Sequence, residues 1–222
     1  MLQRINRKIL LYFFLFIILG TLNNKNLSTF NFSKINSIKI YGLETDSNRF
    51  SKKIKLLNLD NIFFLNKSSI IELFDSNNLI EEYKIFKIYP SSLEVKIIET
   101  KFLAITKIDG KTFFVGSNGK FIKANKDVMG LPYIFGDFDI LNFLNLKKII
   151  DESNLDFNDI KNLYYFPSGR WDLETSSEIL IRLPNTKLKE TLDLSLDLLN
   201  NKKFTNIKQI DLRQKNQVIV NE

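Results

Sequence analysis

The sequence contains no cysteine and no histidine among its 222 residues. Without cysteine there is no disulfide and no thiol nucleophile, and without histidine the Ser-His-Asp and Cys-His catalytic groupings are excluded. Almost every transition-metal site is excluded as well, because those sites need cysteine or histidine ligands. We therefore expect a protein that is not an enzyme, with no cofactor and no metal. The absence of cysteine does not fix the redox compartment, since an extracytoplasmic domain with an adequate core needs no disulfide.

Long runs of one charge are also absent. The formal net charge is +7, yet lysines alternate with acidic residues, as in Glu81-Glu82-Tyr83-Lys84 and Glu94-Val95-Lys96. Interspersed charge is typical of a solvated surface, and no nucleic-acid recognition motif is present. We expect neither nucleic acid nor a small-molecule substrate as a partner. A hydrophobic content of 44% suits one large domain or two small ones.

The N-terminal segment carries the longest apolar run. Basic residues within the first eight positions precede an unbroken apolar run over 9–19, which 20–22 extends. The run has no polar face, and the polar stretch Asn23-Asn24-Lys25-Asn26 offers no A-x-A-like signal peptidase site. We therefore predict a retained transmembrane anchor over 9–22 rather than a cleaved signal peptide. The residues expected in the bilayer are Ile9, Leu10, Leu11, Phe13, Phe14, Leu15, Phe16, Ile17, Ile18 and Leu19.

The basic residues of the leading tail predict the topology. By the positive-inside rule, the tail 1–8 lies in the cytoplasm and the residues after the anchor lie outside. We expect a single-pass protein of the cytoplasmic (inner) membrane, in contact with its lipid, with a linker over 23–33 and its main domains in the periplasm.

The next segment, 34–101, predicts a small α+β domain. A strand pattern at 35–41 is followed by two helices with apolar residues at helical spacing. Strands are expected over 80–89 and 93–97, joined by the turn Pro90-Ser91-Ser92. The expected order is β-α-α-β-β, with both helices on one face of a small sheet.

The remaining segment, 102–222, predicts a second module of short strands and two helices. The helices are expected at about 140–153 and 188–199, where apolar residues recur at helical spacing. Asp193 and Asp197 are expected to face water on the second of these helices.

Turn residues divide the strands of this module. Gly116-Ser117-Asn118-Gly119 predicts a hairpin turn with positive φ at both central positions. Leu131-Pro132 and Gly136 together are interpreted as one turn. The chain then closes with strand patterns over 207–212 and 218–220. A strand at the end of a chain either completes a sheet or leaves unpaired backbone groups at its edge.

Two groups of residues raise catalytic alternatives. Ser117 and Lys120 have the Ser-x-x-Lys spacing of a nucleophile pair, but they straddle a hairpin turn instead of starting a helix. Asp137 with Asp139, or Asp109, could form a carboxylate pair of an extracytoplasmic hydrolase. Because these acids stand beside turn residues, solvated loops explain them more simply.

The ordered motifs of the first module resemble a known family. NLDNIFFLNKSSIIELF followed by KIFKIYPSSLEVKIIETKFLAI resembles the POTRA domain of the bacterial division protein family FtsQ, called DivIB in Gram-positive bacteria. The residues that fill the family pattern are Asn61, Phe63, Pro90, Leu93, Val95, Ile97, Glu99 and Ala104. An anchor directly before these motifs strengthens the resemblance.

The second module resembles the same family. The matching features are the hairpin VGSNGKFI, Leu131-Pro132 with Gly136, Gly169-Arg170-Trp171, and Ile210-Asp211-Leu212-Arg213. The resemblance implies an α+β fold in which a single transmembrane helix precedes a POTRA domain and a mixed-sheet domain with helices on one side. Trp171, the single tryptophan, is interpreted as a core or rim anchor.

The resemblance also implies a function, which is that of a non-catalytic scaffold at the division septum. Members of the family hold two single-pass division proteins, FtsB and FtsL, so we expect FtsB-like and FtsL-like partners. The contact in the family adds a partner strand to the last strands of the second domain. The expected partner-binding residues are Arg213, Gln214, Gln217, Val218, Ile219 and Val220.

Two of these residues have particular expectations. Arg213 falls on the arginine of the family motif, and its forked guanidinium group suits a partner carboxylate. Gln214 stands where the family often places an aromatic residue, which removes a typical anchor of the contact. From the residues alone, Val218–Val220 could instead pack inward. A POTRA-containing protein for protein assembly or translocation is the alternative function.

Overall fold

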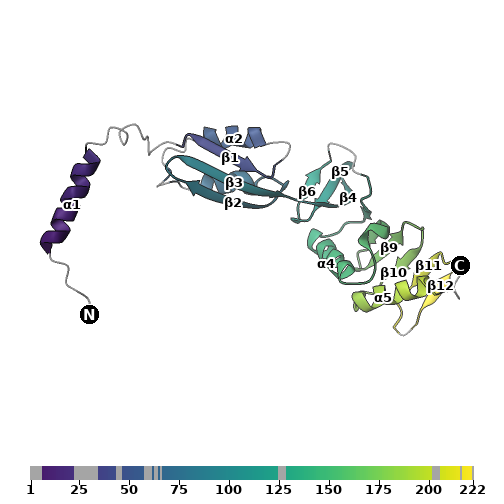
Figure 1. Cartoon of the computed structure of the whole chain (residues 1–222). Coiled ribbons are helices and arrows are strands. Elements are labelled where there is room, and N and C mark those ends of the chain that lie inside the picture. Colours follow the sequence, from purple (N-terminus) through teal and green to yellow (C-terminus); the bar gives the residue numbers. More distant parts are fainter. Residues whose placement is uncertain are drawn as a thin grey trace, which may run out of the picture. The chain divides into compact units, whose positions relative to one another are not determined.

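The computed structural model describes residues 7–22, 35–43, 47–57, 62, 65, 67–124, 129–201, 206–215 and 217–221. The chain divides into two compact units (Figure 1). Unit 1 comprises Met1–Phe74 and Tyr83–Ile97, and unit 2 comprises Asp75–Glu82 and Ile98–Glu222. The predicted domain limits remain predictions.

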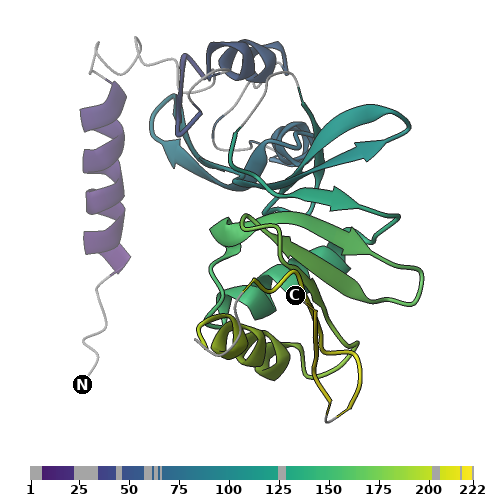
Figure 2. The ribbon, with the colours of Figure 1, turned by 90° about the vertical axis from the view of Figure 1, so that its right-hand side faces the viewer.

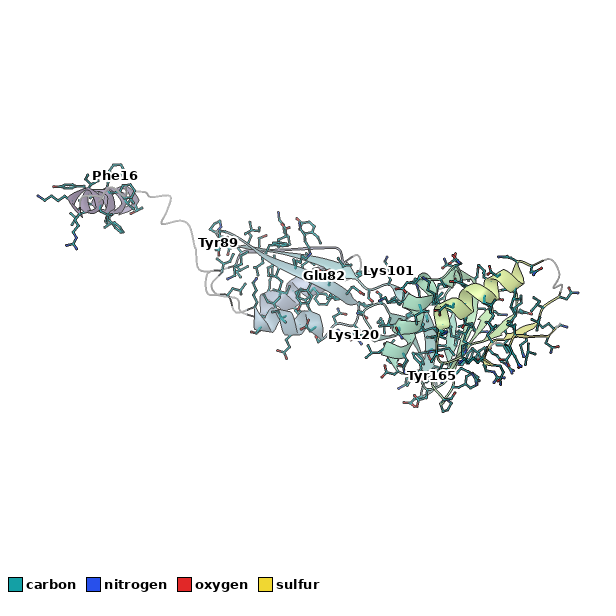
Figure 3. All side chains as sticks on the ribbon, turned by 90° about the horizontal axis from the view of Figure 1, so that it is seen from below. Phe16, Glu82, Tyr89, Lys101, Lys120 and Tyr165 are labelled. Carbon is teal, nitrogen blue, oxygen red and sulfur yellow. The ribbon has the colours of Figure 1, made fainter. Side chains whose placement is uncertain are left out.

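Helix α1 spans Arg7–Leu22 and contains every residue that we expect in the bilayer. Its large apolar side chains are exposed, and among them Phe16, at 76%, has the largest exposed fraction (Figure 3). Membrane anchoring by α1 remains a prediction. Within the described part of the chain, no helix has both the length and the apolar character that crossing a membrane requires.

The predicted β-α-α-β-β order is observed in the elements that follow α1. They are β1 (Ser37–Tyr41), α2 (Ser47–Leu56), α3 (Ser68–Asp75), β2 (Ile80–Ile88) and β3 (Ser92–Glu99). The three strands form one sheet in the order β1-β3-β2, and β1 runs parallel to β3.

The core of unit 1 lies between the sheet and its two helices. Phe50 of α2 and Phe74 of α3 are buried, and their rings stack with centroids 5.7 Å apart. Leu93 and Val95 of β3 are buried on the same side of the sheet, as the alternating pattern of that strand predicts. The motif residues Asn61 and Phe63 lie outside the described residues.

Unit 2 is built on a mixed sheet. Its elements are β4 (Phe102–Ile108), β5 (Lys111–Gly116), β6 (Phe121–Lys123), β7 (Tyr133–Phe135), α4 (Ile140–Asp151), the short 3₁₀ helix η1 (Phe157–Asp159), β8 (Ile160–Tyr165), β9 (Trp171–Thr175), β10 (Leu180–Arg182), α5 (Leu188–Leu199), β11 (Gln209–Asp211) and β12 (Ile219–Asn221). The nine strands follow the order β12-β11-β10-β9-β8-β7-β4-β5-β6. The pairs β4–β7, β7–β8 and β10–β11 are parallel.

Helices α4 and α5 lie on one face of this sheet, where they form its core (Figures 1 and 2). Phe143 of α4, Leu192 of α5 and Leu173 of β9 are all fully buried. Trp171 is 4% exposed, and its ring centroid lies 4.7 Å from that of Tyr165. The interpretation of Trp171 as a core anchor is confirmed, as is the expectation of a large mixed sheet with helices.

The interpretation of Leu131-Pro132 and Gly136 as one turn is wrong. The three residues between them, Tyr133–Phe135, form β7, a central strand that pairs with both β4 and β8. Ile134 of this strand lies opposite Leu163 and is 1% exposed. A three-residue strand is too short to show a period of two, so its pairing partners decide its structure.

One further local prediction is wrong. Of the central residues in the β5–β6 hairpin, Gly119 has a positive φ of 71°, but Asn118 is not among the residues with positive φ. Of the two acidic residues expected to face water on α5, Asp197 is exposed, and Asp193 is half-buried with its carboxylate accepting a hydrogen bond from the backbone N–H of Asn154 at 2.8 Å. The side chains of Asn118 and Asp193 each form a hydrogen bond with residues that are far away in the sequence.

Asn118 binds the segment 75–82. Its side-chain Nδ2 donates to the backbone carbonyls of Asn78 at 2.8 Å and Ile80 at 3.0 Å. Lys120, labelled in Figure 3, donates from Nζ to the carbonyl of Asp75 at 2.8 Å. The β5–β6 turn therefore holds the segment 75–82 as a part of unit 2, and we call this segment the 75–82 strap.

Candidate functional site

The C-terminal strand β12 ends the nine-stranded sheet, and β11 is its only strand neighbour among the described residues. In the antiparallel register Val220 lies opposite Ile210, which is fully buried, so Val220 faces the helices. Ile219 lies opposite Asp211 on the other face and is 53% exposed. Val218, just before β12, is 40% exposed. An edge of this kind presents backbone groups to which another strand can pair.

The opposite edge strand, β6, is not equally open. The 75–82 strap reaches it, because Asn78 donates from Nδ2 to the carbonyl of Phe121 at 2.8 Å. Phe121 is the first residue of β6. Of the two ends of the sheet, the β12 end is therefore the better place for an added strand.

A groove of about 690 Å³ lies beside β12. Its walls are the start of α5 with the residues before it, and the segment that connects β11 to β12. The lining residues are Pro184, Thr186, Lys187, Glu190, Thr191, Leu194, Leu212, Arg213, Gln214, Lys215, Gln217 and Val218. Four of the six residues predicted to bind a partner line this groove, while the other two, Ile219 and Val220, belong to β12.

The apolar lining residues of the groove are Pro184, Leu194, Leu212 and Val218. Leu212 is 6% exposed, whereas Leu194 of α5 is 42% exposed. Sequence reasoning missed Leu194 as a candidate site residue, although a signal was present. At about 100° per residue, Leu194 lies about 200° around the helix from the buried Leu192, on the side that should be polar.

The charged residues of the groove are mostly basic. Lys187, Arg213 and Lys215 are positive, and Glu190 is the one acidic lining residue. This imbalance favours a ligand segment that carries carboxylates.

The guanidinium group of Arg213 is already engaged, because it pairs with Asp211 of its own chain. Nε of Arg213 lies 2.8 Å from Oδ1, and Nη2 lies 2.5 Å from Oδ2. The backbone N–H of Arg213 also donates to Oδ1 at 3.1 Å. These hydrogen bonds lower the pKa of Asp211 and raise that of Arg213. Within the described residues, Nη1 of Arg213 makes no hydrogen bond, so one side of the guanidinium group remains for a partner.

The pair belongs to a row of alternating charges across three strands. Arg182 of β10 lies between Asp172 of β9 and Asp211 of β11 in direct register. Its guanidinium nitrogens are 4.0 Å from Asp172 and 3.9 Å from Asp211. Asp172 also accepts a hydrogen bond from Nε of Arg170 at 3.0 Å. Burial nevertheless raises the pKa of Asp172, because loss of water outweighs the nearby arginines.

Three residues of the catalytic alternatives, Ser117, Lys120 and Asp139, have structural contacts. Ser117 donates from Oγ to Glu81 at 2.6 Å, and Lys120 is bound to the carbonyl of Asp75. Asp139 caps α4 by accepting a hydrogen bond from the N–H of Leu141 at 2.7 Å. Asp109 occupies a turn with a positive φ of 49°.

Comparisons with known proteins point to one family. The family described as "Cell division protein FtsQ/DivIB, C-terminal" matches residues 104–213. The cell division protein DivIB of Clostridium botulinum (strain Loch Maree / Type A3) is 35% identical over 135 residues, which cover 60% of this chain and 50% of the relative. The cell division protein FtsQ of Rickettsia bellii (strain RML369-C) is 29% identical over 174 residues, which cover 75% of this chain and 65% of the relative.

The chain thus spans about half to two thirds of the length of these relatives. One solved structure, the major extracytoplasmic domain of the trans isomer of DivIB from Geobacillus stearothermophilus, is 14% identical with a TM-score of 0.34. That match covers 47% of this chain and 98% of the solved chain.

Proposed function

Because this chain belongs to the FtsQ/DivIB family of cell division proteins, we propose that it is a non-catalytic scaffold of the bacterial division machinery. It binds other division proteins through unit 2, at the edge of β12 and in the adjoining groove. The observation that carries the proposal is the continuity of the two surfaces: Val218 lines the groove and the next residue, Ile219, begins β12.

The mode of binding is addition of a partner strand to the sheet. Backbone hydrogen bonds along β12 supply adhesion, and side chains at alternate positions supply selectivity. Ile219 offers an exposed apolar contact on one face of the added strand. Residues of the partner that flank its strand enter the groove, where Leu194 offers a second apolar contact.

The partner segment combines apolar and acidic residues. Apolar side chains match Leu194 and Ile219, and carboxylates match the basic lining of the groove. Arg213 keeps its internal partner Asp211 and offers its remaining Nη1 to a carboxylate. Because Gln214 replaces an aromatic residue, the apolar contacts of Leu194 and Ile219 carry more of the affinity. We propose FtsB-like and FtsL-like single-pass proteins as the partners.

Membrane attachment through α1 is part of the proposal. The apolar, exposed surface of α1 supports it, as do the basic residues Arg7 and Lys8 at the start of that helix. The extracytoplasmic units then face the periplasm at the division septum, where the partners also have their outer segments. Resistance of the membrane-bound chain to extraction with alkaline carbonate tests this part, and release into the soluble fraction would contradict it.

Co-purification tests the binding site. The full chain in detergent is compared with the variants Ile219→Glu and Leu194→Glu, which place a charge on the exposed apolar contacts. Leu141→Glu is the matched control, because Leu141 is a 69% exposed leucine on α4 that does not line the groove. Circular dichroism and urea denaturation confirm that all variants fold.

We expect single-pass proteins with coiled-coil outer segments to co-purify with the wild type and the control. Each variant at the site should reduce their capture about 30-fold, the effect of losing one hot-spot residue. Equal capture by all four chains would disprove the site. Equal capture by a chain that ends at Leu212 would disprove strand addition at β12.

A further inference from the structure

Helix α2 of unit 1 has a basic outer face. Its sequence, SNRFSKKIKL, contains no acidic residue. Phe50 and Ile54 are buried, at 4% and 0% exposure, whereas Lys52, Lys53 and Lys55 are exposed. At about 100° per residue, Lys52 and Lys55 lie on the side away from the buried pair. Lys53 lies at the flank, with its Nζ 5.8 Å from the centroid of the Phe50 ring and its side chain exposed. The face thus gathers positive charge with no carboxylate of its own helix to offset it.

An exposed leucine lies within this basic face. Leu56 is 78% exposed, and it follows Lys52 by four residues and Lys53 by three. Residues at these spacings are neighbours on a helix surface. Leu57, at 36% exposure, follows directly. A protruding leucine among lysines combines the two contributions, buried apolar area and attraction to anionic lipids, that hold a helix on a membrane surface.

The outer face of α2 is not needed to build unit 1. The helix is held by its inner face, where Phe50 stacks on Phe74 and Ile54 is fully buried. Figure 1 shows α2 lying along the sheet of unit 1 next to β1. Changes to the lysines and to Leu56 should therefore leave the fold intact.

The chain connection limits how far α2 can be from α1. Helix α1 ends at Leu22 and β1 begins at Ser37, with 14 residues between them. Even a fully extended connection of this length spans no more than about 50 Å. If α1 is held in a membrane, unit 1 therefore stays close to the membrane surface, and this raises the effective concentration of headgroups around α2.

We propose that the outer face of α2 binds the anionic headgroup surface of the membrane that holds α1, an inference that rests on the proposed membrane attachment. Lys52, Lys53 and Lys55 lie at the level of the lipid phosphates, and Leu56 enters the boundary between headgroups and acyl chains. A convex helix face with spread charges suits a broad planar surface of diffuse negative charge. The affinity gained is about fivefold for each lysine.

The absence of cysteine makes a site-specific test direct. Leu56→Cys introduces the only thiol of the full chain, which then carries a polarity-sensitive fluorophore. The labelled protein is incorporated in nanodiscs of phosphatidylcholine alone or with phosphatidylglycerol, each containing a spin-labelled quencher lipid. The control label is at Met129→Cys, a 95% exposed position in unit 2.

The charge control is a pair of triple variants. Lys52→Gln, Lys53→Gln and Lys55→Gln remove the basic face of α2. Lys107→Gln, Lys111→Gln and Lys123→Gln remove the same charge from exposed positions in unit 2. Far-ultraviolet circular dichroism verifies that both triple variants keep their structure.

We expect strong quenching at position 56 in discs with phosphatidylglycerol, and little in phosphatidylcholine alone or at position 129. The α2 triple variant should lose this quenching and the unit 2 variant should keep it. If the protein co-elutes with the discs but position 56 is not quenched, the inference is wrong while attachment by α1 stands. Equal quenching in both lipids, or in both triple variants, would also overturn it. A chain that does not enter discs at all refutes both the inference and the proposed attachment.

Discussion

Arg213 and Asp211, two residues apart at the end of β11, form a double hydrogen bond within the chain, with Nη2 2.5 Å from Oδ2 and Nε 2.8 Å from Oδ1. The pair holds the start of the segment that leads to β12, because both the backbone N–H and the guanidinium group of Arg213 bind Asp211. Arg213 also lines the groove. The guanidinium group of Arg213 is thus held in one orientation, which would lower the entropy cost of the binding that we propose.

Asp211→Asn should release this arginine. Because the side chain of Asp211 is only 7% exposed, the loss of its charged hydrogen bonds should lower the free energy of unfolding by about 1–3 kcal/mol. Urea denaturation measures the change. Asp197→Asn, an exposed carboxylate on α5, is the control and should change stability by less than about 0.5 kcal/mol. Equal effects of the two substitutions would contradict a stabilising role for the pair.

The acid sensitivity of the fold should depend on which aspartate is replaced. Arg213 lowers the pKa of Asp211 in the folded state, so Asp211 stabilises the fold above the unfolded pKa of about 3.9. That contribution is lost as the pH falls through the folded pKa. Burial raises the pKa of Asp172 in the folded state, so the effect of this residue on stability has the opposite sign. The charged Asp172 destabilises the fold above its folded pKa, and this destabilisation disappears when acid protonates the carboxylate.

We therefore expect Asp211→Asn to reduce the loss of unfolding free energy between about pH 5 and pH 2. Asp172→Asn should increase that loss, because it removes a group whose penalty acid would relieve. Urea denaturation at several pH values measures both slopes. If Asp211→Asn lost more unfolding free energy on acidification than the wild type, the expected sign of the Asp211 contribution would be wrong.

Asn118→Ala should loosen the 75–82 strap. The substitution leaves the carbonyls of Asn78 and Ile80 without their donor, which should cost about 1–3 kcal/mol. Backbone amide hydrogen exchange should become faster in residues 75–82 under conditions in which the exchange of β9 is still unchanged. Asn142→Ala is the matched control, because its amide makes a longer, exposed hydrogen bond of 3.3 Å to the hydroxyl of Tyr165. Unchanged exchange in the strap would mean that Asn118 does not hold it.

Gly136→Ala should be strongly destabilising. Gly136 has a φ of +102°, and a Cβ there would lie 2.2 Å from the carbonyl oxygen of Tyr165, so the cost should be about 3 kcal/mol or more. Gly110→Ala tests the contribution of φ alone, since Gly110 has a φ of +74° with no atom within 4 Å of the added Cβ. That control should cost about 1–2 kcal/mol. Thermal denaturation compares them, and equal costs would exclude the clash as the cause.

The parts of the fold that the sequence predicts are those with local causes. Helices α4 and α5 follow from apolar spacing over three turns, and the β5–β6 hairpin follows from Asn118-Gly119. The strand β7 could not be predicted, because three residues between a proline and a glycine form a strand only when β4 and β8 are present on both sides. The strand order of the sheet is likewise a property of long-range pairing.

The candidate site also has some features that the local sequence predicts and others that it does not. A strand at the C-terminus could be predicted from Ile219 and Val220, and the structure places it at the edge of the sheet. The pairing of Arg213 with Asp211 is not part of the prediction, although only Leu212 separates the two residues in the motif. The expectation for Arg213 comes from resemblance and assigns this residue to a partner. The groove forms only when α5 and the β11–β12 segment come together, and this long-range contact cannot be predicted from local sequence. The one local indication is Leu194, an apolar residue on the side of α5 that should be polar.

The hydrogen bond from Asn78 to Phe121 makes the two ends of the sheet unequal. Copies with two equally open edges could join end to end without limit, which is how sheet proteins form fibres. Here the 75–82 strap contacts β6, whereas no strap contact is described at β12. If a strand is added at β12, as we propose, the same addition is less favoured at β6, and this asymmetry opposes end-to-end growth of the sheet.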